Sequence, residues 1–467
     1  MVFSSITFLY FFLPAVIILY LLSPKKAGNI ILLVAGLLFY AWGEPAYLWV
    51  MIASSLVDYA AGIYIDRSDK KGHRRLALII SMCVDLGFLF VFKYSGFAVN
   101  VFNSVFGTNF DAPDLPLPIG ISFYTFQSMS YTIDIYLGKV KVQKNFINYL
   151  TYVSLFPQLV AGPIVRYEEV AAEIENRSSN VDNFGEGAGI FIKGLAKKVL
   201  LANNIGMLWT QVKAMDYSQI SVLTAWLGIL AFTFQIYFDF SGYSDMARGL
   251  GRIFGFNFPI NFDHPYQSRS ISEFWRRWHI TLGSWFRTYV YIPLGGNRKG
   301  KFRTYRNLAI VWILTGFWHG ASFNFIFWGM FYGILIIIER LGFSRVLEKL
   351  PPVISRAYTF FMVVTGWVMF DIDTMPDVLR YLKAMFAGNG LADSLALYQL
   401  SSFGVIFVLC IFASTDIWSR ITSVLSVSVR TRKIYAYTAP AVMLFLLLLS
   451  TCYLVDATYN PFLYFRF

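Results

Sequence analysis

Long apolar runs separated by short polar segments extend along almost the whole chain. A transmembrane helix needs about 20 mainly apolar residues, and many of these runs approach that length. The stronger candidate spans are residues 6–22, 28–42, 46–65, 75–95, 119–137, 222–240, 323–338, 357–370, 402–417 and 436–455. Weaker candidates are residues 146–162, 187–209 and 307–318. The pattern predicts an all-α, polytopic membrane protein with about eleven transmembrane helices.

The composition agrees with this class of protein. Of 467 residues, 57% are hydrophobic and 14% are charged, whereas a soluble protein carries about a quarter charged residues. No polar stretch is long enough to fold alone, so we expect a single membrane domain over residues 1–467. The net charge of +12 fits basic cytoplasmic loops better than a nucleic-acid surface, so we expect a lipid bilayer and no nucleic acid as a partner.

Basic loops predict the orientation of the first half. Lys25 and Lys26, residues 67–75 and residues 139–144 follow the first, third and fifth spans, and residues 100–118 between them carry no Lys or Arg. Because basic loops stay on the cytoplasmic side, we expect a multi-pass membrane protein with its N-terminus outside.

Two features interrupt the apolar pattern. Pro157, Gly162 and Pro163 break the apolar stretch that starts at residue 146, which predicts re-entrant segments buried in protein. Four acids also lie inside apolar runs: Asp58, Asp85, Asp134 and Asp239. We interpret these as paired structural charges or groups near the membrane interface, in preference to the lining of an internal cavity.

Residues 264–306 combine aromatic and cationic side chains. A helix is predicted to start near Ser270 or Ser272, both good N-caps. At helical spacing one face holds Trp275, Trp278, His279, Leu282, Trp285 and Phe286. The opposite face holds Arg276, Arg277, Thr281, Ser284 and Arg287. This predicts one amphipathic helix at the membrane interface, with the arginines facing lipid phosphates.

A cationic cluster follows this helix, at Arg298, Lys299, Lys301, Arg303 and Arg306. It is either an ordinary positive-inside loop or a landing site for a phosphate-bearing donor such as coenzyme A. The segment GGNRKGKF resembles a P-loop, but Phe302 replaces the required Ser or Thr, which argues against nucleotide hydrolysis.

Histidine is the remaining candidate for acid–base chemistry. The chain has no GxSxG elbow and no histidines at metal-ligand spacing, so we expect neither a serine hydrolase nor a metal site. His319 lies in the apolar stretch TGFWHGASFNFIFWG between Gly316 and Gly320. Burial there is expected to keep its imidazole neutral and able to act as a base. The alternative for His319, and for His279, is a hydrogen-bonded core histidine.

Several longer motifs resemble one family. LPIGISFYTFQSMSYTIDIY, FPQLVAGPIVRY, SEFWRRWHITLGSWFRTYVYIPLGGNR, GFWHGASFNFIFWG and the final NPFLYFRF are similar to the membrane-bound O-acyltransferase superfamily, in its bacterial alginate O-acetylation branch. The resemblance extends over nearly the whole chain and implies a bacterial inner membrane as the location of the protein. It implies a ring of tilted helices around a thin central region, with a cytoplasmic funnel for the donor.

The resemblance also implies residue roles. His319 matches the superfamily's near-invariant histidine, and His279 matches its second, more variable active-site position. The other substrate-binding candidates are Trp275, Trp278, Trp285, Trp318, Asn324, Arg298, Lys299 and Lys301. Acetyl-coenzyme A is the implied donor, with no permanently bound cofactor, and a membrane-anchored or secreted SGNH-type partner completes transfer to an exported polysaccharide.

Three functions are therefore weighed. The first is O-acetylation of an exported, alginate-like polysaccharide, with His319 as the essential base. The second is acyl transfer to peptidoglycan, cellulose or teichoic acid. The third, from a different class, is a transporter or flippase whose path is lined by the intramembrane acids, although the sequence lacks the two corresponding halves typical of many transporters.

Overall fold

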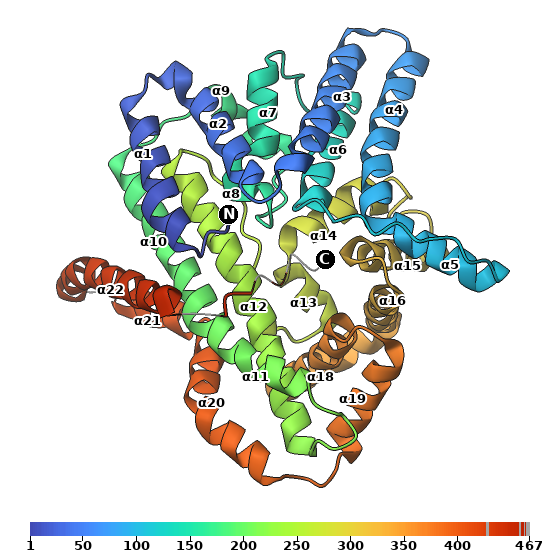
Figure 1. The fold of residues 1–467 in the computed structure, drawn as a ribbon, viewed down its shortest axis with the longest axis vertical. Coiled ribbons are helices and arrows are strands. Elements are labelled where there is room, and N and C mark those ends of the chain that lie inside the picture. The colour runs from blue at the N-terminus through green and yellow to red at the C-terminus, as the bar shows by residue number, and fades with distance from the viewer. Residues whose placement is uncertain (426–428, 457–458, 462, 464–467) are drawn as a thin grey trace. The chain divides into compact units, whose positions relative to one another are not determined.

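The computed structural model describes residues 1–425, 429–456, 459–461 and 463, and every regular element in these ranges is a helix (Figure 1). The all-α class predicted from the sequence is confirmed. In the first half the α-helices are α1 (Leu13–Leu22), α2 (Gly28–Ala41), α3 (Leu48–Arg67), α4 (Lys71–Leu89), α5 (Ser95–Phe106), α6 (Ile121–Tyr136), α7 (Phe146–Ser154), α8 (Phe156–Leu159), α9 (Tyr167–Glu175), α10 (Val181–Ala196) and α11 (Asn203–Lys213).

The second half continues the same architecture. Its α-helices are α12 (Val222–Ile253), α13 (Ile271–Arg277), α14 (Ile280–Phe286), α15 (Lys301–His319), α16 (Phe323–Ile338), α17 (Ser344–Lys349), α18 (Pro352–Asp371), α19 (Met375–Ala387), α20 (Ser394–Ala413), α21 (Ile417–Leu425) and α22 (Val429–Asp456). Short π-helical or 3-10 segments are η1 (Phe8–Phe12), η2 (Lys25–Ala27), η3 (Pro45–Tyr47), η4 (Phe90–Tyr94), η5 (Lys197–Ala202), η6 (Pro265–Gln267), η7 (Arg287–Tyr291) and η8 (Glu339–Phe343).

Seven helical stretches in the described residues are long and apolar enough to cross a membrane. They are Pro45–Arg67, Lys71–Phe106, Val222–Ile253, Phe323–Lys349, Pro352–Asp371, Ser394–Ala413 and Ala436–Asp456. A shorter apolar helix covers Phe8–Leu22. The other predicted spans fall on shorter or less apolar helices, among them α2, α6 and α15. This helix content is that of a multi-pass membrane protein.

The chain forms two compact units. The first contains residues 1–191 and 245–259, and the second contains residues 192–244 and 260–467. The single membrane domain expected over residues 1–467 stays a prediction. Both candidate histidines lie in the second unit.

In the first unit, α3, α4 and α6 pack around a buried acid pair. Ser54 Oγ donates to Asp85 Oδ1 at 2.6 Å, and Ser81 Oγ donates to Asp58 Oδ1. Both carboxyl groups are buried, and each accepts a hydrogen bond from a serine on the other helix. Gly62 on α3 lies against α6, where an added Cβ would come 3.1 Å from the ring of Tyr131.

The other two intramembrane acids are paired with lysines. Asp134 lies 3.1 Å from Lys139 Nζ, and Asp239 lies 2.5 Å from Lys198 Nζ within the second unit. Both acids are buried, so each needs its cation to offset the loss of hydration. The lysine contacts agree with the interpretation of Asp134 and Asp239 as paired charges, whereas the printed partners of Asp58 and Asp85 are serine hydroxyls.

The region around residues 146–166 is interrupted, as its prolines and glycine predict. α7 ends at Ser154, α8 is a single turn, and residues 160–165 continue without helix although all are buried. Tyr152 Oη donates to the carbonyl oxygen of Val165 at 2.9 Å. A protein side chain thus supplies a hydrogen-bond partner for the backbone of this non-helical segment. The re-entrant path itself stays a prediction.

The core of the second unit forms where α15 and α16 approach closely. An added Cβ on Gly316 would lie 2.2 Å from the carbonyl oxygen of Phe325, and one on Gly329 would lie 2.3 Å from that of Trp312. These glycines allow near backbone contact, which brings the end of α15 against a cluster of buried tryptophans.

Candidate active site

The predicted amphipathic helix over residues 275–287 is broken at its centre. α13 ends at Arg277, α14 begins at Ile280, and His279 between them has φ 47° and ψ 53°. This left-handed conformation is rare for a residue with a side chain and costs roughly 1 kcal/mol. The prediction of one continuous helix was therefore wrong, although its start was right, because Ser270 Oγ accepts a hydrogen bond from the N–H of Glu273 as N-cap.

Residues 261–263 explain the break. The N–H of Ile280 donates to the carbonyl oxygen of Asn261 at 3.0 Å, and the N–H of Asp263 donates to that of Arg277 at 2.9 Å. These bonds occupy backbone groups on both sides of His279. The backbone bonds of residues 261–263 therefore stabilise a break in the helix at His279.

The side chain of Asn261 also sets the state of the histidine ring. Its Oδ1 accepts from the N–H and the Oγ1 of Thr281, at 3.2 and 3.0 Å, and lies 3.2 Å from Nδ1 of His279. Because a backbone N–H can only donate, this amide atom must be the oxygen, and Nδ1 of His279 must carry the proton. The lone pair of the neutral ring is then on Nε2. Asn261 Nδ2 donates to Ser244 Oγ at 3.1 Å, which fixes the amide further.

His279 is uncharged at neutral pH. Its side chain is only 2% exposed, and burial lowers the pKa of the ring to about 3. The ring of Phe240 meets it edge-on at 4.8 Å between centroids. The ring of His279 is therefore neutral in a dry environment, and its Nε2 is able to accept a hydrogen bond.

Glu339 holds the start of α13. Its buried carboxylate accepts from the N–H of Ile271 at 2.6 Å and from the N–H of Ser272 at 2.9 Å. A carboxylate is stabilised at a helix N-terminus by the exposed N–H groups and the helix dipole. Because η8 carries Glu339, that turn fixes the helix that leads to His279.

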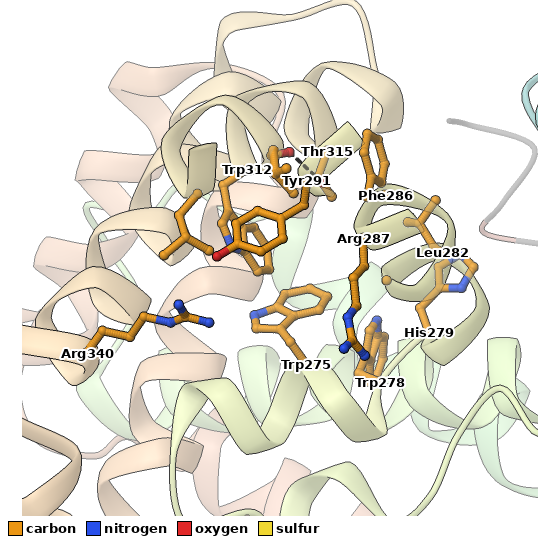
Figure 2. Close-up of a pocket in the computed structure, with 13 residues that line it drawn as sticks. Trp275, Trp278, His279, Leu282, Phe286, Arg287, Tyr291, Trp312, Thr315 and Arg340 are labelled. Atoms are coloured by element: carbon orange, nitrogen blue, oxygen red, sulfur yellow. Dashed lines mark hydrogen bonds between the residues drawn. The ribbon is translucent and has the colours of Figure 1, made fainter. Parts of the chain in front are cut away.

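A cavity of about 230 Å³ reaches His279 (Figure 2). Its walls are mainly aromatic and aliphatic side chains: Trp275, Trp278, Leu282, Phe286, Tyr291, Leu308, Val311 and Trp312. Trp275 lies 4.9 Å from Trp312 between ring centroids, which closes one wall. The cavity is thus narrow, largely apolar and bounded at one point by an oriented imidazole.

Two arginines bring positive charge to this apolar cavity. Arg287 of η7 and Arg340 of η8 line it, and Figure 2 shows their guanidinium groups on either side of Trp275. The sequence pattern placed Arg287 on the lipid-facing side of a continuous helix. That interpretation was wrong, because the helix is broken at His279 and Arg287 lines the cavity one turn after Gly283. Arg340 was not predicted as a site residue. The only indication of it in the sequence was a charged residue directly after an apolar span.

His319 lies at the end of α15 in an aromatic surround. Its ring meets those of Trp318, Trp328 and Phe370 at 4.9, 5.0 and 5.3 Å between centroids, and its side chain is 4% exposed. It is not among the residues that line the cavity. The ring of Trp318 also meets His279 at 6.1 Å, so one indole contacts both histidines.

The remaining predicted site residues divide into two groups. Trp285 packs on Phe286 and Tyr289 at 5.5 and 5.2 Å, and Asn324 Nδ2 donates to the carbonyl oxygen of Ile372 at 2.6 Å. Neither residue lines the cavity itself, although Trp285 packs on Phe286, which does. Arg298, Lys299 and Lys301 are exposed and do not line the cavity either.

The fold and the site define an integral membrane protein with an uncharged histidine at a deep, aromatic cavity. Comparison with known proteins identifies the class of enzyme: the profile of the membrane-bound O-acyltransferase family matches residues 139–370, which contain both histidines. The chain belongs to the membrane-bound O-acyltransferase family and is an acyltransferase.

Relatives with assigned names cover most of the chain. It is 39% identical to the probable alginate O-acetylase AlgI of Pseudomonas putida over the full length of both proteins. It is 44% identical to the probable alginate O-acetylase AlgI of Pseudomonas aeruginosa over 83% of this chain and 75% of that protein. It is also 34% identical to the peptidoglycan O-acetyltransferase of Helicobacter pylori, over 84% of this chain and 81% of that protein.

Proposed function

We propose that the protein moves acetyl groups from cytoplasmic acetyl-coenzyme A across a bacterial inner membrane for O-acetylation of an exported cell-envelope polysaccharide. The observation that carries this proposal is the cavity at His279, which combines apolar walls, two arginines and an uncharged imidazole. The names of its relatives, which include alginate O-acetylases, support this acceptor class.

The donor fits the cavity in both shape and charge. An acyl-coenzyme A has a slender, uncharged pantetheine arm and a phosphate-rich nucleotide. A cavity of about 230 Å³ suits the arm alone, because pockets for whole drug-sized ligands measure about 300–1,000 Å³. Arg287 and Arg340 are placed to bind phosphate oxygens through paired N–H donors. The exposed Arg298, Lys299 and Lys301 remain candidates for the nucleotide phosphates outside.

The two histidines supply the proton transfer. In the proposed step the acceptor hydroxyl loses its proton to the imidazole of His319 while its oxygen attacks the thioester carbonyl carbon. The carbon–sulfur bond then breaks, and the thiolate takes up a proton to leave as coenzyme A. His279, whose Nε2 bears the lone pair, meets the donor in the cavity, and Trp318 lies against both rings.

The acceptor reaches the site from the opposite side of the membrane. An exported polymer cannot enter a cavity of this size, so a membrane-anchored or secreted SGNH-type partner is the expected carrier of the acetyl group to its final hydroxyl. The proposed topology has the N-terminus outside and the basic loops of the first unit in the cytoplasm.

Replacement of each histidine tests the proposal. A deletion strain is complemented with the wild type, His319→Ala, His279→Ala or a control, His73→Ala, which alters an exposed residue of α4. Exported polymers are then analysed for O-acetyl groups by mass spectrometry, and the membrane fraction is immunoblotted. We expect the active-site variants to insert normally but to lose acetylation by about 100-fold or more, since general-base catalysis contributes 10²–10⁴-fold. Normal acetylation with His319→Ala would remove the assigned base.

A second acceptor is favoured by one comparison. The Helicobacter pylori relative is named a peptidoglycan O-acetyltransferase and aligns with 84% of this chain. Muropeptides from the same strains are therefore analysed together with the soluble exopolysaccharide. Loss of acetyl groups from muropeptides alone would assign the enzyme to peptidoglycan.

A further inference from the structure

The first unit contains a polar cavity at the ends of three helices. It has a volume of about 430 Å³ and is bounded by residues 20–29, 145–148 and 174–179. The segment between α1 and α2 forms one wall, the start of α7 another and the end of α9 the third. None of these residues belongs to the unit that holds the two histidines.

Cations outnumber acids in the cavity lining. Lys25, Lys26 and Arg177 face one carboxylate, that of Glu175. The two lysines are exposed on the short turn η2. This leaves an excess of two positive charges around a space large enough for a small anion.

Arg177 is held in place as part of the wall. Its Nε donates to Tyr20 Oη at 2.9 Å, its Nη1 donates to Asn29 Oδ1, and its guanidinium lies 4.6 Å above the ring centroid of Phe256. An arginine fixed by such contacts presents its charge without first losing much conformational freedom. The lysines, by contrast, are able to adjust to a ligand.

Backbone groups add further positive potential. α2 starts at Gly28 and α7 starts at Phe146, and both starts adjoin the cavity. Each helix N-terminus contributes the positive end of its dipole, while the N–H of Gly28 donates to the carbonyl oxygen of Lys25 and that of Ile147 to Asn145 Oδ1. Asn29 and Asn148, joined by a 2.8 Å hydrogen bond, supply uncharged polar surface between them. The cavity therefore offers the cationic and polar groups that proteins use to bind phosphate.

The neighbouring surface is apolar. On α1, next to the cavity, Leu19, Leu21 and Leu22 are 58%, 58% and 81% exposed. Exposed leucines beside a cationic turn at the end of an apolar helix are typical of the boundary between acyl chains and headgroups. We propose that this cavity binds the phosphate of an anionic phospholipid, with the acyl chains lying along α1.

Native mass spectrometry of the full-length protein tests this site. The probes are palmitoyl-oleoyl phosphatidylglycerol, the zwitterionic palmitoyl-oleoyl phosphatidylcholine and soluble glycerol 3-phosphate. The test variant is the double change Lys25→Gln and Lys26→Gln, and the matched control is Lys70→Gln and Lys71→Gln, two exposed lysines elsewhere in the same unit that do not line the cavity.

The expected result is retention of phosphatidylglycerol over phosphatidylcholine by the wild type and the control. The test variant should lose about 25-fold in affinity for phosphatidylglycerol, equivalent to about 1 kcal/mol per lysine. Equal retention of both lipids by the wild type overturns the proposal. An equal loss in the control variant overturns the assignment to this cavity, and displacement of the lipid by glycerol 3-phosphate identifies a soluble phosphate as the ligand instead.

Discussion

The side-chain oxygen of Asn261 lies 3.2 Å from Nδ1 of His279 and accepts the proton on that nitrogen. The same oxygen accepts from the backbone N–H of Thr281, so the amide cannot be reversed without losing that bond. One buried asparagine therefore determines which nitrogen of the ring is able to accept a proton.

Replacing Asn261 should change the chemistry of the site more than the amount of folded protein. Asn261→Ala removes the partner of Nδ1, and we expect acetyl transfer to fall about 10- to 100-fold, which is the effect of losing 1–3 kcal/mol of hydrogen bonding in the transition state. Asn261→Asp keeps the acceptor but adds a negative charge, which raises the pKa of His279 from about 3. The acidic limb of its pH–rate profile should therefore move to higher pH. An unchanged profile in Asn261→Asp would contradict the positioning role.

Arg287 and Arg340 should control the affinity for the donor. Arg287→Gln and Arg340→Gln each remove a guanidinium from the cavity lining. We expect the KM for acetyl-coenzyme A to rise about tenfold or more in each, with a small effect on kcat, since a phosphate contact is made equally in the ground and transition states. The control is Arg345→Gln, an exposed residue of α17 that does not line the cavity. Arg298→Gln tests the loop separately: if it alone raises KM, the loop and not the cavity binds the donor phosphates.

Acid should destabilise the protein through His279. The folded-state pKa is about 3, below the unfolded value near 6.5, so the unfolded chain binds the proton first as the pH falls. Stability from the neutral ring is fully present above about pH 6.5 and declines by about 1.4 kcal/mol per pH unit between about pH 6.5 and 3. Thermal unfolding in detergent measures this decline. His279→Asn should flatten the slope and His73→Asn, on the exposed part of α4, should not.

The contact of α15 with α16 should not tolerate a methyl group. In Gly316→Ala the new Cβ would lie 2.2 Å from the carbonyl oxygen of Phe325, which forces the helices apart and costs about 1–3 kcal/mol. Gly404→Ala on α20 is the matched control because no atom lies within 4 Å of its added Cβ. We expect it to be neutral or stabilising by up to about 1 kcal/mol. Equal melting temperatures for the two variants would argue against the close contact.

The buried acid pair should accept an amide but not a methyl group. Asp58→Asn keeps a side-chain oxygen that accepts from Ser81 Oγ, so its free energy of unfolding should stay within about 1 kcal/mol of wild type. Asp58→Ala leaves the buried Ser81 Oγ without this acceptor and should cost about 1–3 kcal/mol. Similar losses in both variants would argue against the hydrogen bond from Ser81 to residue 58.

The sequence predicts those elements whose determinants are local. Apolar runs are sufficient to place the helices, because backbone in a bilayer must satisfy its own hydrogen bonds. Ser270 identifies the start of α13, and Gly316 indicates the close helix contact beside His319. Each of these signals lies within a few residues of the feature that it predicts.

The features that sequence reasoning missed depend on contacts between distant segments. The spacing of Trp275, Trp278 and Leu282 fits a continuous helix, and only the backbone of residues 261–263 turns the chain at His279. Arg340 lies 61 positions after His279 in the sequence. It lines the cavity because it belongs to η8, the turn that directly follows α16. The spacing of residues within 264–306 therefore predicts neither the break at His279 nor the position of Arg340.

Glu339 and Arg340 are consecutive residues on one π-helical turn, yet the first holds the start of α13 and the second lines the cavity. The donor phosphate proposed to bind Arg340 would therefore lie one residue from the carboxylate that caps α13, and α13 carries Trp275 and ends two residues before His279. Donor binding is then expected to be linked to the position of this short helix.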